Sequence, residues 1–169
     1  MKTISDYLGK QLKLSQPSFF KNYYELRSGG ELVATLNQPK FLSSNTVTSG
    51  MFGECEFYRP SFWRFDVAVR EKYKELPIAK FVREGFKQKG VIELPKGERL
   101  NLIFRKIVFS FEIQNEMGLT LVRFKKKFSF KTNIEIEIEK TSELINKYPW
   151  VILLACYIVI QIERRSKAG

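Results

Sequence analysis

Apolar and polar residues alternate with a period of two through much of the chain, which is the pattern of half-buried β-strands. Between Arg64 and Arg70, for example, Phe65, Val67 and Val69 would share one face of a strand. About ten to twelve such segments follow one another at short spacing, with turn residues between them. This arrangement predicts a mainly β domain, either a sandwich or a barrel.

The longest alternating segment runs from Val122 to Ile138 and exceeds the length of an ordinary strand. Apolar residues favour its even positions and charged residues its odd ones, so a turn near 131–133 would fold it into a hairpin with one apolar face. The expected cross-strand pairs, two on the core face and two on the outer face, are Phe130–Ile134, Phe128–Ile136, Lys127–Glu137 and Lys125–Glu139. A bent continuous strand would keep the same alternation.

Two local signals add detail to the N-terminal part of the chain. The turn sequence Ser28-Gly29-Gly30 separates two alternating segments and is the strongest hairpin signal present. Nearer the N-terminus, Ile4, Leu8 and Leu12 recur at intervals of four and predict a short amphipathic helix.

Every residue from Trp150 to Ile160 is apolar, and Pro149 before them suits the first turn of a helix, so we expect a helix over 149–165. A helix that is apolar all round must be buried on all sides, in a bilayer or in a protein core. As a helix the run rises about 20 Å, short of the roughly 30 Å of a bilayer interior. A membrane anchor and a buried strand are the alternatives. We favour a helix enclosed by the strands, because a strand buried on both faces needs covering layers that the chain does not offer.

Three phrases, with many short strands before one apolar C-terminal helix, resemble the tubby C-terminal-like superfamily, which includes phospholipid scramblases and plant LURP-one-related proteins. The phrases are 24–36 (YELRSGGELVATL), 62–65 (FWRF) and 149–155 (PWVILLA). The resemblance implies a single domain over 1–169, a closed antiparallel β-barrel of about twelve strands around a central hydrophobic α-helix. Tubby proteins bind phosphoinositides through surface basic residues and scramblases are tied to membranes, but none of those binding residues is matched to a position here.

The candidate chemistry is sparse. The chain has 0 histidines, which excludes Ser-His-Asp and Cys-His nucleophile systems and histidine-ligated metals. Its 2 cysteines, Cys55 and Cys156, form no disulfide framework and favour a reducing compartment. Glu135, Glu137 and Glu139 are interpreted as a solvated strand face that opposes lysines. With no phosphate loop or dinucleotide fingerprint either, the sequence predicts a non-enzymatic protein without cofactor or metal.

The formal net charge of +11 indicates attraction to anions or, alternatively, general solubility. The candidate site for an anionic headgroup is a basic stripe made of Arg123, Lys125, Lys126, Lys127 and Lys131. The alternative is an outer face neutralised by the facing glutamates, with Lys126 at a bulge or strand edge because it breaks the apolar parity.

The expected partner is an anionic phospholipid or membrane surface, or an acidic protein. Nucleic acid is disfavoured, since most phenylalanines lie on apolar faces and not among basic residues. The basic residues Arg164, Arg165 and Lys167 are expected to complement the dipole at the end of the C-terminal helix. Without an apolar leader at its start, the chain is expected to be cytoplasmic, including the periphery of a membrane.

Overall fold

The structure is a computed structural model that describes residues 2–39, 45–61, 63–85, 88–106 and 109–168. It contains a closed antiparallel barrel in which each strand pairs with its neighbours in sequence and β1 pairs with β12. The strands are β1 (Gln11–Ser15), β2 (Tyr23–Ser28), β3 (Glu31–Asn37), β4 (Thr46–Gly50), β5 (Cys55–Tyr58), β6 (Asp66–Glu71), β7 (Pro77–Arg83), β8 (Lys89–Glu93), β9 (Arg99–Lys106), β10 (Ser110–Gln114), β11 (Thr120–Lys126) and β12 (Asn133–Ile138). Closure leaves no unpaired sheet edge, so the predicted closed barrel is confirmed.

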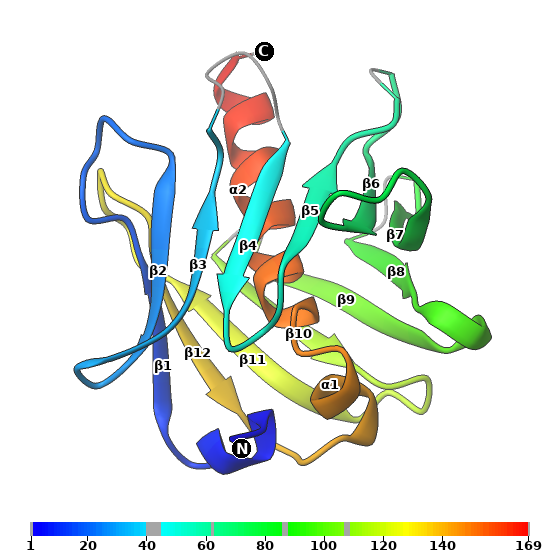
Figure 1. Ribbon diagram of the computed structural model, residues 1–169, viewed down its shortest axis with the longest axis horizontal. Helices are drawn as coiled ribbons and strands as arrows, with labels where there is room; N and C mark the ends of the chain where they lie inside the picture. The colour runs from blue at the N-terminus through cyan, green and yellow to red at the C-terminus, as the bar shows by residue number, and fades with distance from the viewer. Residues whose placement is uncertain (1, 40–44, 62, 86–87, 107–108, 169) are drawn as a thin grey trace.

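The C-terminal helix α2 (Val151–Ala168) runs through the middle of the barrel, as Figure 1 shows. Every side chain from Val151 to Ile160 is buried, because the inward-facing residues of the strands surround the helix. The enclosed helix, and not the anchor or the strand, is therefore the observed conformation of the apolar run. Among the described residues, none of the helices has the length and apolarity needed to cross a membrane.

Aromatic residues fill much of the space between the barrel wall and α2. The ring of Tyr157 on the helix lies 5.5 Å from that of Phe57 on β5. On the opposite wall, Phe111 and Phe124 stack with their centroids 4.5 Å apart and their planes 9° from parallel. The inward-facing residues of the strands therefore form the core together with α2. The aromatic ones contribute most, because a large ring buries much apolar area.

A short helix, α1 (Glu143–Lys147), closes the end of the barrel where α2 begins (Figure 1). The hydroxyl of Ser142 accepts a hydrogen bond from the backbone N–H of Ile145 at 3.4 Å, which is a helix N-cap. The 28–30 turn also folds as predicted, with Gly29 at φ +58° between β2 and β3.

The N-terminal helix expected from the four-residue spacing is wrong. Only a 3₁₀ turn, η1 (Ile4–Tyr7), forms there, and Leu8 is exposed. Gly9 follows at φ +73°, which ends the turn, and Leu12 then points inward from β1. Pairing of β1 with two neighbouring strands outweighs a weak local helical pattern.

The hairpin of β11 and β12 forms, but in a different register from the expected one. Phe124 faces Ile136 and Lys125 faces Glu135, whereas Phe128 and Phe130 lie outside the barrel in the loop 127–132. The alternation stays on the same faces, because the register changes by an even number of positions. The barrel interior ends at Lys126, so no core remains for the two phenylalanines.

The two ends of the barrel differ in chemistry. One end carries η1, α1 and the start of α2. The other end, called the basic rim, is formed by residues 16–22, 59–61, 63–65, 84–85, 88 and 127–132 together with the last turns of α2 (Figure 1). Exposed lysines, among them Lys21, Lys127, Lys131 and Lys167, lie at this rim, so an anion is expected to be attracted to this end of the barrel.

Candidate functional site

The predicted basic stripe does not form one continuous surface. Arg123 and Lys125 point outward from β11, whereas Lys126 points into the barrel and is buried. Lys127 and Lys131 lie on the following loop, at the basic rim. The stripe is therefore divided between the side wall, the interior and the rim.

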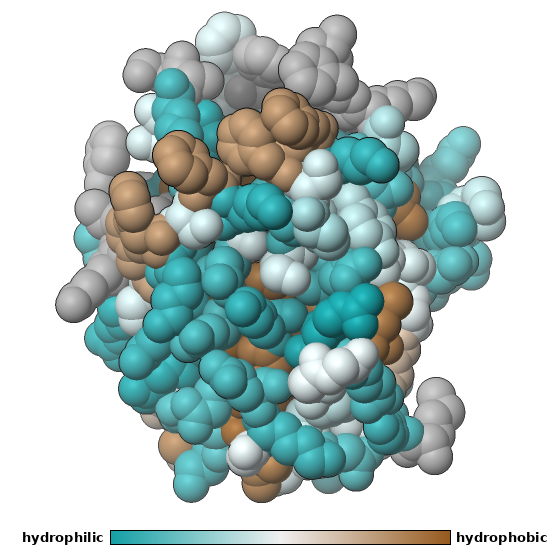
Figure 2. Space-filling model, turned by 90° about the vertical axis from the view of Figure 1, so that its left-hand side faces the viewer, coloured by the Kyte–Doolittle hydropathy of each residue, from teal (hydrophilic) through white to brown (hydrophobic). Residues whose placement is uncertain are grey.

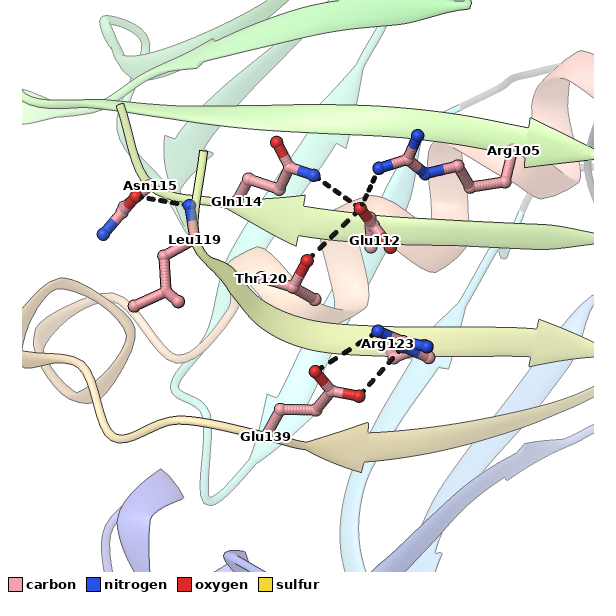
Figure 3. A network of polar contacts seen from close by, with 8 residues as sticks. All are labelled: Arg105, Glu112, Gln114, Asn115, Leu119, Thr120, Arg123 and Glu139. Atoms are coloured by element: carbon pink, nitrogen blue, oxygen red, sulfur yellow. Dashed lines mark hydrogen bonds and ion pairs between the residues drawn. The ribbon is translucent and has the colours of Figure 1, made fainter. Parts of the chain in front are cut away.

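On the side wall the arginines are paired with acidic residues, as Figure 3 shows. Arg123 Nε lies 2.9 Å from Glu139 Oε1, and Arg105 Nη2 lies 2.8 Å from Glu112 Oε1. Burial alone would raise the pKa of Glu112, but hydrogen bonds from Arg105 and Gln114 outweigh it and lower that pKa. This wall corresponds to the neutralised outer face that was the alternative for the stripe.

Lys126 is neither at a bulge nor at a strand edge, so that expectation is wrong. It stays in register opposite Ile134 and its ammonium forms an ion pair with Glu163 of α2. Glu163 also lies 3.0 Å from Lys167. Burial by itself would raise the pKa of Glu163, but the hydrogen bonds from both lysines lower it below its ordinary value. The pair ties the last inward position of β11 to the central helix.

Replacing Glu163 with glutamine is expected to destabilise the fold by about 1–3 kcal/mol at neutral pH, because the buried Lys126 loses its counter-charge. A lowered folded-state pKa means that the stabilisation is present above the ordinary value of 4.5 and disappears as the pH falls through the folded value. Urea unfolding of both proteins should therefore show a gap that closes under acid. Glu139→Gln on the exposed wall is the control, with less than about 1 kcal/mol expected. A pH-independent gap would contradict this account.

Arg164 is held in place by uncharged groups at the rim. Its guanidinium donates to Gln38 Oε1 at 2.6 Å, to Asn22 Oδ1 at 2.6 Å and to the Tyr24 hydroxyl at 2.7 Å. These three acceptors fix the position of the guanidinium, and none of them is a carboxylate that would neutralise it. The expected role of basic residues at the helix C-terminus is compatible with this clamp.

On the other side of α2 the rim contains a cleft of about 580 Å³, called the arginine cleft below. Its walls come from the segment before β6, the end of β7 and the last turns of α2. The lining residues are Trp63, Arg64, Phe65, Asp66, Arg83, Gly85, Ile162, Arg165 and Ser166. The acid in this set, Asp66, already lies 3.6 Å from Arg64. The cleft is therefore positively charged with partly aromatic walls.

Arg83 in the cleft wall and Arg59, which stacks on the cleft residue Phe65, have buried guanidinium nitrogens that find no hydrogen-bond partner among the described residues. They are Nε and Nη2 of Arg59 and Nε of Arg83. Arg59 stacks on Phe65, with its Cζ 4.9 Å from the ring centroid. Burial, and secondarily the charge of Arg165, lowers the pKa of Arg59. An unmet buried donor costs roughly 1–3 kcal/mol, so an anion that accepts from these groups would be bound favourably.

The cysteines lie away from this chemistry. Burial raises the pKa of Cys55 to about 11 and raises that of Cys156 further, so both remain protonated thiols. Within the part of the chain that the structure describes, no three His, Cys, Asp or Glu side chains are grouped to hold a metal. The arrangement at the rim is suited to binding anions.

Sequence reasoning missed the arginine cleft because its residues are scattered along the chain. Arg59, Arg83 and Arg165 belong to three segments that only barrel closure brings together. The sequence Trp63-Arg64-Phe65 resembles part of a family phrase, but it contains a single cation, Arg64, and so predicts no basic site. The arginines that precede and follow strands were the available signal.

The closed barrel has a known structural counterpart. An X-ray structure of a protein from Arabidopsis thaliana matches over 92% of this chain and 93% of that chain, with a TM-score of 0.64 and 11% sequence identity. At this identity the likeness shows the fold and nothing further. No family profile matches the chain, and no curated protein matches it either.

Proposed function

We propose that this protein is a non-catalytic binding module that holds an anionic phospholipid headgroup in the arginine cleft. The observation that carries the proposal is a set of buried guanidinium nitrogens, on Arg83 in the cleft wall and on Arg59 beside Phe65, that lack a hydrogen-bond partner within the described part of the chain. Guanidinium groups bind phosphate oxygens through paired N–H donors, and the buried ring of Phe65 shields the guanidinium of Arg59 on one face. An acidic protein is the alternative occupant, and the experiment below separates the two.

The cations around the cleft support a membrane-facing orientation of the basic rim. Lys21, Lys127, Lys131 and Lys167 are exposed on the neighbouring loops and on the last turns of α2. Each basic residue near an acidic membrane surface contributes about 1 kcal/mol of attraction. We propose a cytoplasmic location at the periphery of a membrane, which these exposed lysines support.

Membership of the tubby C-terminal-like superfamily is part of the same proposal. The closed barrel around a hydrophobic C-terminal helix supports it, and so do the phrases at 24–36, 62–65 and 149–155. Phosphoinositide binding in that superfamily makes a phosphorylated headgroup the first ligand to test. Because one fold can serve unrelated functions, the proposal depends on the residues of the cleft and not on the fold.

Replacing Arg59 and Arg83 together with glutamine is expected to weaken binding of a soluble headgroup, inositol trisphosphate, by about tenfold or more, because two charge-assisted contacts are lost. Isothermal titration calorimetry measures this, and binding by the unaltered protein should weaken as salt rises.

The matched control is Arg123→Gln with Lys125→Gln, which removes two cations from the side wall. That variant should bind the headgroup almost as the unaltered protein does. Loss of binding in the control, with retention in the cleft variant, would move the site to the predicted stripe. Binding of an acidic peptide in place of inositol trisphosphate would favour a protein partner.

A further inference from the structure

Two neighbouring loops of the basic rim expose phenylalanines that the fold does not bury. Phe20, Phe128 and Phe130 are 93%, 95% and 94% exposed, and Phe19 is 55% exposed. Figure 2 shows apolar side chains gathered at the top of the face that contains β1, β2 and β12, above a mainly hydrophilic wall. A cluster of large, exposed apolar side chains is typical of a surface that contacts a partner or a membrane.

The two loops are held against one another by hydrogen bonds, so the phenylalanines are presented on a built surface. Gln16 is buried, and its amide accepts from the N–H of Thr132 at 3.2 Å and donates to the carbonyl of Lys21 at 2.8 Å. The backbone N–H of Gln16 also donates to the carbonyl of Thr132 at 3.1 Å. Lys131 donates to the carbonyl of Pro17 at 3.4 Å, which adds another link between the loops.

The loops that carry the phenylalanines are positively charged, although Lys127 lies 3.6 Å from Glu135 on β12. Loops 16–22 and 127–132 contain Lys21, Lys127 and Lys131 and have no acidic residue in their sequences. Phe109 joins the group from the next hairpin, with its ring centroid 6.5 Å from that of Phe128. Aromatic rings surrounded by lysines match the boundary between anionic headgroups and acyl chains, where the rings leave water and the cations stay at the headgroups.

We propose that loops 16–22 and 127–132 insert Phe19, Phe20, Phe128 and Phe130 into the surface of an anionic bilayer. This inference rests on the proposed function, because it supplies the attachment that brings the arginine cleft to its headgroup. The loops and the cleft flank opposite sides of the last turns of α2: Glu163 and Lys167 line the pocket beneath the loops, and Ile162 and Arg165 line the cleft. One approach to a membrane therefore engages both.

The first test compares vesicle binding by the unaltered protein and by a variant with Phe128→Ser and Phe130→Ser. Vesicles of phosphatidylcholine with phosphatidylserine are sedimented, and the partition coefficient of the variant is expected to fall by about tenfold or more. The control is Tyr73→Ser with Leu76→Ser, because these side chains are 91% and 80% exposed but lie on a different loop, between β6 and β7. Unchanged partitioning of the phenylalanine variant would overturn the proposal.

A second measurement reports insertion directly. Cys55 and Cys156 are buried, so a cysteine introduced as Ser129→Cys can be labelled selectively with an environment-sensitive fluorophore. Anionic vesicles should shift its emission to the blue, whereas a label at Glu116→Cys in the β10–β11 turn should not respond. An unshifted label at 129 on vesicle-bound protein would overturn the insertion.

Failure of this inference and failure of the proposed function give different results. The phenylalanine variant should retain inositol trisphosphate binding, and the Arg59/Arg83 variant should retain the emission shift at high vesicle concentration. If the phenylalanines instead mediate self-association, sedimentation equilibrium will show a dimer that Phe128→Ser with Phe130→Ser dissociates, without vesicle binding. That result would assign the surface to a second copy of the chain and refute the membrane proposal.

Discussion

Removing residues 149–169 is expected to abolish cooperative folding. The deleted segment contains the buried run Val151–Ile160, which fills the barrel from inside. Each large apolar side chain there contributes roughly 1.5–3 kcal/mol of burial, and together they exceed the about 5–15 kcal/mol by which a domain is stable. Thermal unfolding followed by near-ultraviolet circular dichroism should show no transition, and the chain should bind a hydrophobic dye. A soluble, cooperatively folding truncated chain would show that α2 is dispensable.

Two milder variants keep the truncation experiment interpretable. Leu154→Ala removes part of one fully buried side chain and is expected to cost about 2–5 kcal/mol, with the fold retained. Deleting only residues 166–169, of which Ser166 and Lys167 are exposed, should change the free energy of unfolding little. A graded series of this kind ties the loss of folding to the apolar run itself.

Gly90→Ala is expected to destabilise the protein by about 2–3 kcal/mol through overpacking. A Cβ at this buried position on β8 would lie 2.2 Å from Cε2 and 2.3 Å from Cζ of Phe81, and 3.0 Å from the carbonyl oxygen of Val82. Phe81 is 0% exposed, so its ring has no free space to move into. Urea unfolding at equilibrium measures the change. An unaltered midpoint would mean that the core around Phe81 is loose.

The control for Gly90 is Gly30→Ala, since a Cβ at Gly30 would meet nothing within 4 Å. That change should alter stability by less than about 0.5 kcal/mol. The double variant Gly90→Ala with Phe81→Leu relieves the clash and should be more stable than the sum of the two single changes predicts. If the two free-energy changes are strictly additive, the destabilisation by Gly90→Ala does not come from a clash with Phe81.

Much of the architecture could be predicted from the chain because strand and helix periodicity records which side chains are buried. The alternation around Val67 and Val69, the 28–30 turn and the apolar run after Pro149 all lie in elements of the expected kind, whereas Phe65, expected on the strand, lies just before β6. The register of β11 and β12 could not be predicted, since shifting it by an even number of positions leaves every side chain on the same face. Local charge pairing therefore selected the wrong partners for Lys125 and Lys127.

The candidate site was less predictable than the fold. The stripe was chosen because its cations are close in sequence, yet Arg123 is paired with Glu139 and Lys126 with Glu163. For Arg59 and Arg83 the local signal was limited to their place at the ends of β5 and β7, because neither lies in a basic cluster. Phe128 and Phe130 were assigned to the core by parity, although the strand leaves the barrel before them.

The chain by itself determined that this protein is a β domain with a central helix, because burial imposes a period of two on strands and an all-apolar surface on an enclosed helix. Only the tertiary structure decided where the barrel interior ends and which guanidinium nitrogens, as far as the described residues show, are buried without a partner. Both depend on groups that are distant in sequence and meet only when β1 closes on β12 around α2. Closure buries guanidinium nitrogens of Arg59 and Arg83 and leaves four phenylalanines outside, and this difference in burial underlies the binding surface that we propose.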